Sequence, residues 1–81
     1  MRCFVYKSLK KADTYIYLTE KDSFQEVPDR LLKLFGTPEF ALEFELYAGR
    51  KLALADATQV IESLQQQGYY LQMPEENNLP I

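Results

Sequence analysis

The sequence predicts an α/β (α+β) fold: a small sandwich of one four-stranded sheet, in the order ββαβαβ along the chain, with helices packed on both faces of the sheet. Three observations lead to this prediction. Four segments are rich in β-branched and aromatic residues, as strands are. Two segments carry apolar residues at helical spacing. Three of the strands are apolar on both sides, so both faces of the sheet need a cover.

Length and composition indicate one small domain. The chain has 81 residues, and a chain of this size buries about 60% of the surface that its unfolded form exposes. We expect a single domain over residues 1–74 and a mobile polar tail over residues 75–81. No run approaches the roughly 20 apolar residues of a membrane span, and the charge at Arg2 is unlike a signal peptide. We therefore expect a cytoplasmic protein with no membrane partner.

The first two predicted strands form a hairpin. Residues 2–7 (RCFVYK) and 14–19 (TYIYLT) have strand composition, and the polar residues 8–13 between them are few enough for a hairpin loop. With Ser8 opposite Asp13, one face of the hairpin would be aliphatic and the other aromatic. Each face would then need its own cover.

A short helix is predicted after the hairpin. Ser23 and Glu26 have capping-box spacing, which predicts one helical turn. Pro28 suits the first position of the following helix, where its missing N–H is not needed. Gly36 and Pro38 end that helix, which is about two turns long and must be held by packing. Its buried stripe consists of four apolar residues: Leu31, Leu32, Leu34 and Phe35.

The third predicted strand, residues 40–47, shows the clearest alternation in the chain. Glu43 and Glu45 point to one side, and four apolar residues point to the other: Phe40, Leu42, Phe44 and Leu46. This pattern is typical of a half-buried strand, and the outward charges protect an exposed sheet edge.

A second helix and a last strand complete the predicted fold. The helix covers residues 55–67, with Asp56 in its first turn and one apolar stripe: Ala57, Val60, Ile61 and Leu64. Gly68 ends it in the left-handed conformation. Residues 69–73 are apolar or aromatic at four of five positions, which predicts an interior strand covered on both faces. Pro74 ends that strand.

A series of short motifs runs through most of the chain in a fixed order. They are Tyr6-Lys7-Ser8 with Lys10-Lys11, Thr14-Tyr15-Ile16-Tyr17, Phe24 with Val27-Pro28, Phe35-Gly36-Thr37-Pro38, Arg50-Lys51-Leu52, Asp56, Val60 and residues 68–74 (GYYLQMP). At these spacings the motifs resemble those of the YcgL family of small bacterial proteins. The resemblance implies a small α/β sandwich, a biochemical role that is not established and no catalytic motif. Members often lie near the gene for a ribonuclease of the D type, so it also implies a link to RNA metabolism.

Missing residue types exclude most catalytic mechanisms. The chain has no His, so it has no Ser-His-Asp or Cys-His arrangement. One Cys without His leaves no zinc site of the usual kind, and three isolated glycines form no phosphate loop. The net charge of −3 argues against a duplex DNA binder. We therefore predict no catalytic residue, no cofactor, no metal and no duplex DNA partner.

Two carboxylates and one thiol remain as candidates for chemistry. Glu43 and Glu45 stand about 6.5–7 Å apart along one strand face, a separation that an acid/base pair or a cation site could use. The simpler interpretation, which we adopt, is a solvated strand face. Cys3 beside Arg2 could be an activated thiol, but free Cys is among the most buried residue types, so we predict a buried hydrophobic residue.

Basic and aromatic residues gather around the predicted hairpin. Together they form one candidate surface for nucleic acid or a partner: Lys7, Lys10, Lys11, Tyr15 and Tyr17. Single-stranded RNA binders stack bases on aromatic rings and meet phosphates with Lys or Arg. In the alternative interpretation, which we favour, these tyrosines are core residues under a helix. Their solvent exposure distinguishes the two interpretations.

The sequence therefore predicts a non-enzymatic protein-interaction or adaptor module with an unknown protein partner. The alternative is a weak single-stranded RNA-binding protein that uses the candidate hairpin surface. An enzyme that uses Glu43 and Glu45 ranks third. A partner could also add a strand to the edge strand, residues 40–47, although its two glutamates disfavour such pairing.

Overall fold

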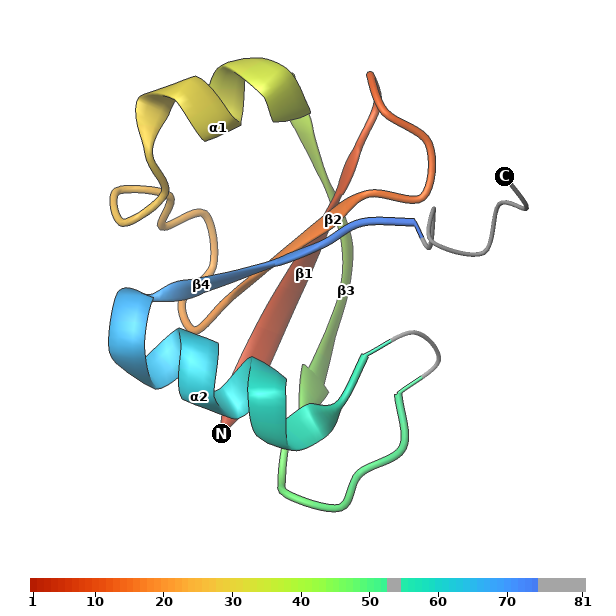
Figure 1. The fold of residues 1–81 in the computed structure, drawn as a ribbon, viewed down its shortest axis with the longest axis vertical. Coiled ribbons are helices and arrows are strands. Elements are labelled where there is room, and N and C mark those ends of the chain that lie inside the picture. Colours follow the sequence, from red (N-terminus) through yellow and green to blue (C-terminus); the bar gives the residue numbers. More distant parts are fainter. Residues whose placement is uncertain (53–54, 75–81) are drawn as a thin grey trace, which may run out of the picture.

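The computed structural model describes residues 1–52 and 55–74. Its elements follow in the order β1 (Arg2–Ser8), β2 (Tyr15–Leu18), α1 (Asp29–Phe35), β3 (Pro38–Glu45), α2 (Ala57–Gln67) and β4 (Tyr69–Gln72). Figure 1 shows the strands crossing between the two helices. The predicted order ββαβαβ is confirmed. The tail predicted over residues 75–81 lies outside the described residues.

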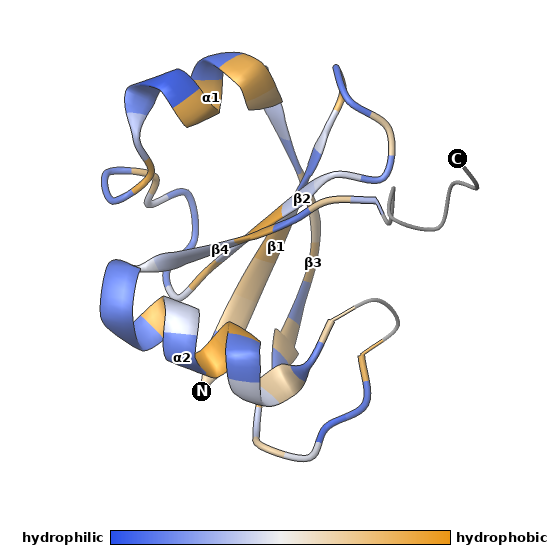
Figure 2. Cartoon of the chain, in the orientation of Figure 1, coloured by the Kyte–Doolittle hydropathy of each residue, from blue (hydrophilic) through white to orange (hydrophobic). Residues whose placement is uncertain are grey.

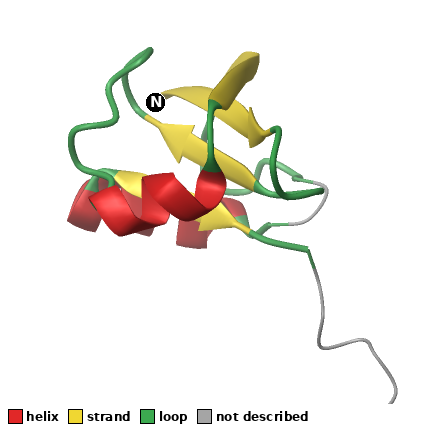
Figure 3. Ribbon diagram, turned by 90° about the horizontal axis from the view of Figure 1, so that it is seen from above, coloured by secondary structure: helices red, strands yellow, loops and turns green. Residues whose placement is uncertain are grey.

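The four strands form one antiparallel sheet in the order β3-β1-β2-β4, with the strands splayed by its twist (Figure 3). In the described part of the chain, β4 pairs with β2 alone. The prediction of an interior strand at residues 69–73 is therefore wrong. Tyr70 packs toward one face of the sheet and Leu71 toward the other. An edge strand can also be covered on both faces of the sheet. Apolar side chains on both sides of a strand therefore indicate that both faces are covered, and they do not show whether the strand has one or two neighbouring strands.

The β1–β2 hairpin pairs one residue away from the predicted register. Val5 lies opposite Tyr17, and the Ser8 N–H donates to the Thr14 carbonyl at 2.9 Å. The loop is thus one residue longer than predicted, and Asp13 at its end has a φ of 56°. Because a shift of one residue exchanges the faces of a strand, each face mixes aromatic and aliphatic residues. The predicted separation into an aliphatic and an aromatic face is wrong.

Alternate side chains build one hydrophobic cluster on each face of the sheet. The cluster on the α2 face contains Cys3, Val5, Tyr17, Leu46, Ala57, Val60 and Leu64. The cluster on the α1 face contains Tyr6, Ile16, Leu18, Val27 and Phe35. The two helices therefore cover opposite faces, as predicted. Figure 2 shows hydrophobic residues along β1 and on both helices.

Helix α2 begins two residues later than predicted, because Asp56 is its N-cap and not part of its first turn. The carboxylate of Asp56 accepts a hydrogen bond from the Thr58 N–H at 3.1 Å, which satisfies a donor that the first turn leaves free. At the other end Gly68 adopts the left-handed conformation and donates to the Ser63 and Leu64 carbonyls, as predicted for a glycine cap. Among the described residues, no helix is long and apolar enough to cross a membrane.

Helix α1 is confirmed, with Pro28 as its N-cap instead of its first residue. The helical turn predicted at Ser23 is absent from the described segment between β2 and α1, which forms turns. The Tyr6 hydroxyl holds this segment on the sheet, since it donates to Asp22 Oδ1 at 2.9 Å and accepts from the Asp22 N–H at 2.6 Å. A tertiary contact thus replaces the predicted capping box.

A β-bulge in β3 divides its apolar side chains between the two faces. Val5 pairs with Leu42, but the next residue of β1, Tyr6, pairs with Phe40, so Ala41 is the extra residue. Phe40 consequently packs on the α1 face, where its ring centroid lies 5.5 Å from that of Tyr6. The prediction that Phe40 points the same way as Leu42 is wrong. Leu42 is left on the α2 face, where it borders a cleft.

Candidate functional site

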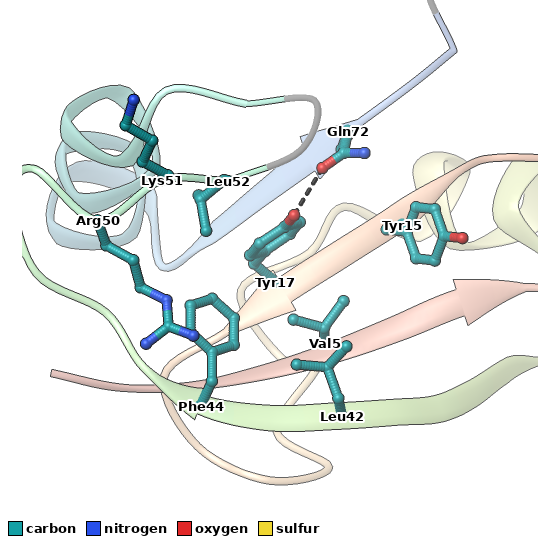
Figure 4. Close-up of a pocket in the computed structure, with 9 residues that line it drawn as sticks. All are labelled: Val5, Tyr15, Tyr17, Leu42, Phe44, Arg50, Lys51, Leu52 and Gln72. Carbon is teal, nitrogen blue, oxygen red and sulfur yellow. Dashed lines mark hydrogen bonds between the residues drawn. The ribbon is translucent and has the colours of Figure 1, made fainter.

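A cleft of about 330 Å³ opens on the α2 face of the sheet, between β3 and residues 50–52 (Figure 4). All four strands contribute residues to it. Helix α2 packs mainly on β4 and β2, and Leu42 on β3 stays exposed. We refer to it as the α2-face cleft. Its lining residues are Val5, Tyr15, Tyr17, Leu42, Phe44, Arg50, Lys51, Leu52 and Gln72.

The floor of the cleft is a buried aromatic group. Tyr17 is only 8% exposed, and its hydroxyl donates to Gln72 Oε1 at 2.6 Å. Its ring lies edge-on to Tyr70 and to Phe44, with centroid separations of 5.5 Å and 6.5 Å. Burial is the main cause that raises the pKa of Tyr17 to about 12, so its hydroxyl stays protonated at neutral pH. The floor is therefore neutral and firmly held.

The wall of the cleft that β3 provides is apolar. Leu42 is 49% exposed, and no residue of β3 itself is fully buried. Phe44 is half-buried and lies two residues further along the same face. A leucine side chain exposed to this extent leaves apolar surface in water, and its burial by a partner would be favourable.

Arg50 stands at the rim of the cleft in a fixed position. Its guanidinium lies 4.8 Å from the Phe44 ring centroid and 5.9 Å from that of Tyr47. Its Nη1 donates to the Glu45 carbonyl at 3.1 Å. Within residues 1–52 and 55–74, no carboxylate lies within ion-pair distance of Arg50 or of the neighbouring Lys51. The cleft therefore combines an apolar lining with a cation that has no acidic partner there.

The structure separates the residues of the candidate hairpin surface. Tyr15 and Tyr17 meet in the cleft, but Tyr17 is buried in its floor and Tyr15 is half-buried. The three lysines are exposed and do not line the cleft. Lys7 forms an ion pair with Glu39 on β3 at 3.7 Å, and the Lys10 ammonium donates to a carbonyl of α1 at 3.3 Å. Lys11 borders a smaller apolar hollow of about 70 Å³ on the α1 side.

Sequence reasoning missed the β3 wall and the basic rim. Leu42 and Phe44 carry the signal of a covered strand face, and nothing in that pattern shows that α2 leaves them open. Arg50 and Lys51 stand in a predicted turn, where charged residues are ordinary. The available signal was that Arg50 follows Phe44 and Tyr47 closely in the sequence, which is only a weak indication of a cation–π contact.

The two strand glutamates lie outside the α2-face cleft and the smaller hollow. Both are exposed; Glu43 forms an ion pair with Arg2 at 3.4 Å and Glu45 with the N-terminal amine at 2.9 Å. The hydrogen bond from that amine lowers the pKa of Glu45. Our interpretation of a solvated strand face is confirmed.

Cys3 is fully buried in the α2-face cluster. Burial raises the pKa of its thiol to about 11, which disfavours the reactive thiolate. The interpretation of Cys3 as a buried hydrophobic residue is confirmed. In the described part of the chain, no three His, Cys, Asp or Glu side chains gather as metal ligands.

Comparisons with known proteins point to one domain type along the whole fold. The family model of the YcgL domain matches residues 3–75. A YcgL domain-containing protein of Thioalkalivibrio sulfidiphilus is 52% identical over 81 residues, which are 100% of both chains. One from Photobacterium profundum is 54% identical over 74 residues, 91% of this chain and 79% of the relative. One from Serratia proteamaculans is 47% identical over 74 residues, 91% of this chain and 82% of the relative. These names state a domain and no activity.

Proposed function

The chain belongs to the YcgL domain family, and from this premise we propose that it is a non-enzymatic protein-interaction module of the bacterial cytoplasm. One observation carries the proposal: the α2-face cleft is lined by a half-exposed Leu42 and by an arginine that has no acidic partner in the described residues. Binding sites are typically concave, mostly apolar and supplied with a few polar groups. In this proposal the cleft takes an apolar side chain of a partner protein between Leu42 and Tyr15.

The chemistry of the lining supports binding over catalysis. None of its nine residues is a carboxylate, a thiol or an imidazole. Tyr17 has a raised pKa, and its hydroxyl donates a hydrogen bond to Gln72 Oε1, so it stays protonated and is a poor general base at neutral pH. The volume, close to the lower end of the roughly 300–1,000 Å³ of ligand pockets, suits one or two side chains.

The alternative proposal is weak single-stranded RNA binding by the candidate hairpin surface. The exposed positions of Lys10 and Lys11 support it. Base stacking, however, needs an exposed ring face, and Tyr17 is buried while Tyr15 is half-buried. The geometry therefore supports the protein-interaction module better.

A pair of matched variants tests the proposal. Leu42→Asp places a charge in the cleft, whereas Leu9→Asp places one on an equally apolar residue that is 61% exposed in the hairpin loop. Tagged wild type and both variants are used for capture from nuclease-treated bacterial lysate, and mass spectrometry identifies the retained proteins. We expect one protein set to be retained by wild type and Leu9→Asp and lost from Leu42→Asp, because burying a carboxylate in an apolar site is unfavourable.

Each other outcome decides against the cleft. Retention of the same proteins by Leu42→Asp, with an unchanged circular dichroism spectrum, would show that binding occurs elsewhere. RNA that co-purifies without nuclease, and is lost from the double variant Lys10→Glu and Lys11→Glu, would favour the RNA proposal. Retention of neither protein nor RNA would count against both.

A further inference from the structure

Arg50 is held in place before any ligand arrives. Its guanidinium lies against the Phe44 ring, as Figure 4 shows. It also lies near the Tyr47 ring, and its Nη1 donates a hydrogen bond to the Glu45 carbonyl. An arginine ordered in this way loses less conformational entropy when it binds than a free surface arginine does. The contacts thus aim a rigid guanidinium at the rim of the cleft.

Most of the hydrogen-bonding capacity of this guanidinium is free. It has five N–H donors, and the described contacts use one of them. The three glutamates of β3 do not neutralise it, because each is paired elsewhere: Glu39 with Lys7, Glu43 with Arg2 and Glu45 with the N-terminal amine. The rim of the cleft is therefore positive on a chain whose net charge is −3.

Resting on the proposed function, we infer that the α2-face cleft recognises an acidic peptide segment of the partner, with its carboxylate on Arg50 and a neighbouring apolar side chain on Leu42. Guanidinium groups bind carboxylates through two parallel hydrogen bonds, which gives both strength and orientation. The fixed arginine and the exposed leucine lie on the same cleft, so one short segment reaches both. The positive charge of Arg50 selects the carboxylate, and the apolar wall at Leu42 selects an apolar side chain next to it in the peptide.

A peptide carboxylate fits this site better than the phosphate of a nucleic acid. A nucleic acid chain presents a row of phosphates and is met by several cations along its backbone. The cleft offers one guanidinium directed at its rim, and Figure 4 shows the ammonium of Lys51 pointing away from the floor. The lining is otherwise apolar or aromatic apart from Gln72, whose amide oxygen is already bonded to Tyr17.

Titration with peptide pools, followed by NMR of the labelled protein, tests the inference. One pool of terminally blocked hexapeptides mixes Leu, Phe and Asp in all orders, and the other replaces Asp by Asn. We expect the Asp pool to shift the resonances of Tyr15, Leu42 and Arg50, with half-saturation at a concentration about tenfold lower than for the Asn pool. Arg50→Glu should abolish this preference. Arg30→Glu is the matched control, because it makes the same charge reversal at an exposed residue of α1 that does not line the cleft, and it should change the preference by no more than about twofold.

The outcomes separate this inference from the proposed function. If both pools bind equally and Leu42→Asp binds neither, the proposed contact between Arg50 and a carboxylate is wrong, and the proposed protein-interaction module is retained. An Arg30→Glu effect as large as that of Arg50→Glu would overturn the specific contact, because it would show that only the overall charge of the protein matters. Stronger binding of a short oligonucleotide or a phosphopeptide than of the Asp pool would overturn the choice of ligand. No shift at the cleft with either pool would overturn the inference, and the capture experiment would decide the function separately.

Discussion

Tyr17 makes the stability of the protein depend on pH in the alkaline range. Burial raises its pKa from the ordinary value of 10.0 to about 12, with smaller contributions from Cys3, Tyr70 and Tyr15. The native state therefore keeps a proton that the unfolded chain gives up first. This contribution to the free energy of unfolding is complete below pH 10 and is lost as the pH rises toward 12.

Tyr17→Phe tests this expectation in urea unfolding at a series of pH values. At neutral pH the variant should be about 1–2 kcal/mol less stable, because Gln72 Oε1 loses its buried donor. Above pH 10 its stability should fall less steeply than that of wild type. The raised pKa values of Cys3 and Tyr6 are present in both proteins and affect both curves. Parallel curves would show that the Tyr17 hydroxyl is not responsible.

At the residue level, the sequence identified part of the candidate site. Tyr15 and Tyr17 do line the cleft, because they are two residues apart on β2 and so point to the same face of the sheet. Which of them is exposed depends on where α2 lies across the sheet, and this is set by packing between distant segments. The rim residue Arg50 could not be identified, since its contacts with Phe44 and Tyr47 arise only when the chain turns back after β3.

Gly68, at the end of α2, combines backbone strain with a tertiary contact. Its φ is 88°, and a Cβ there would lie 2.7 Å from Cγ and 2.9 Å from Cβ of Glu26. We expect the left-handed conformation alone to make Gly68→Ala lower the free energy of unfolding by about 1–2 kcal/mol. The displacement of Glu26 should add a further loss to this value. Thermal and urea unfolding measure the loss.

Gly49 provides the matched control. Its φ is 93°, but a Cβ there would meet no atom of another described residue within 4 Å. Gly49→Ala should therefore cost only the left-handed strain, and the difference between the two variants reports the contact of α2 with the segment before α1. Equal losses would show that the Glu26 contact contributes nothing to stability.

At the level of elements, the sequence predicted all six and misplaced what depends on their partners. Hydrophobic periodicity gave the strands and helices, because each must bury one face or two. The β3 bulge at Ala41 was not predictable, since it adjusts β3 to β1 and leaves the alternation in the sequence intact. The edge position of β4 was missed for a similar reason. A strand that is covered on both faces has the same apolar pattern whether it pairs with one neighbouring strand or with two.

At the scale of the whole molecule, one sheet joins two hydrophobic clusters. The same strand, β1, supplies Cys3 and Val5 to the α2 face and Tyr6 to the α1 face. A loss of packing on either face therefore weakens the strand that both faces share. We expect the two clusters to unfold together, as in most small single domains.

Val60→Ala tests this coupling. Val60 is fully buried between α2 and the sheet, and the loss of two methyl groups there should cost about 2 kcal/mol. Urea unfolding followed by NMR should show the resonances of Phe35, on the opposite face, losing their native positions at the same lowered midpoint as those of Leu64 beside the substitution. The helix that carries Phe35 has seven residues and is too short to persist alone, so it must follow the sheet. A Phe35 midpoint that stays at its wild-type value while that of Leu64 falls would show that the α1 face is held independently.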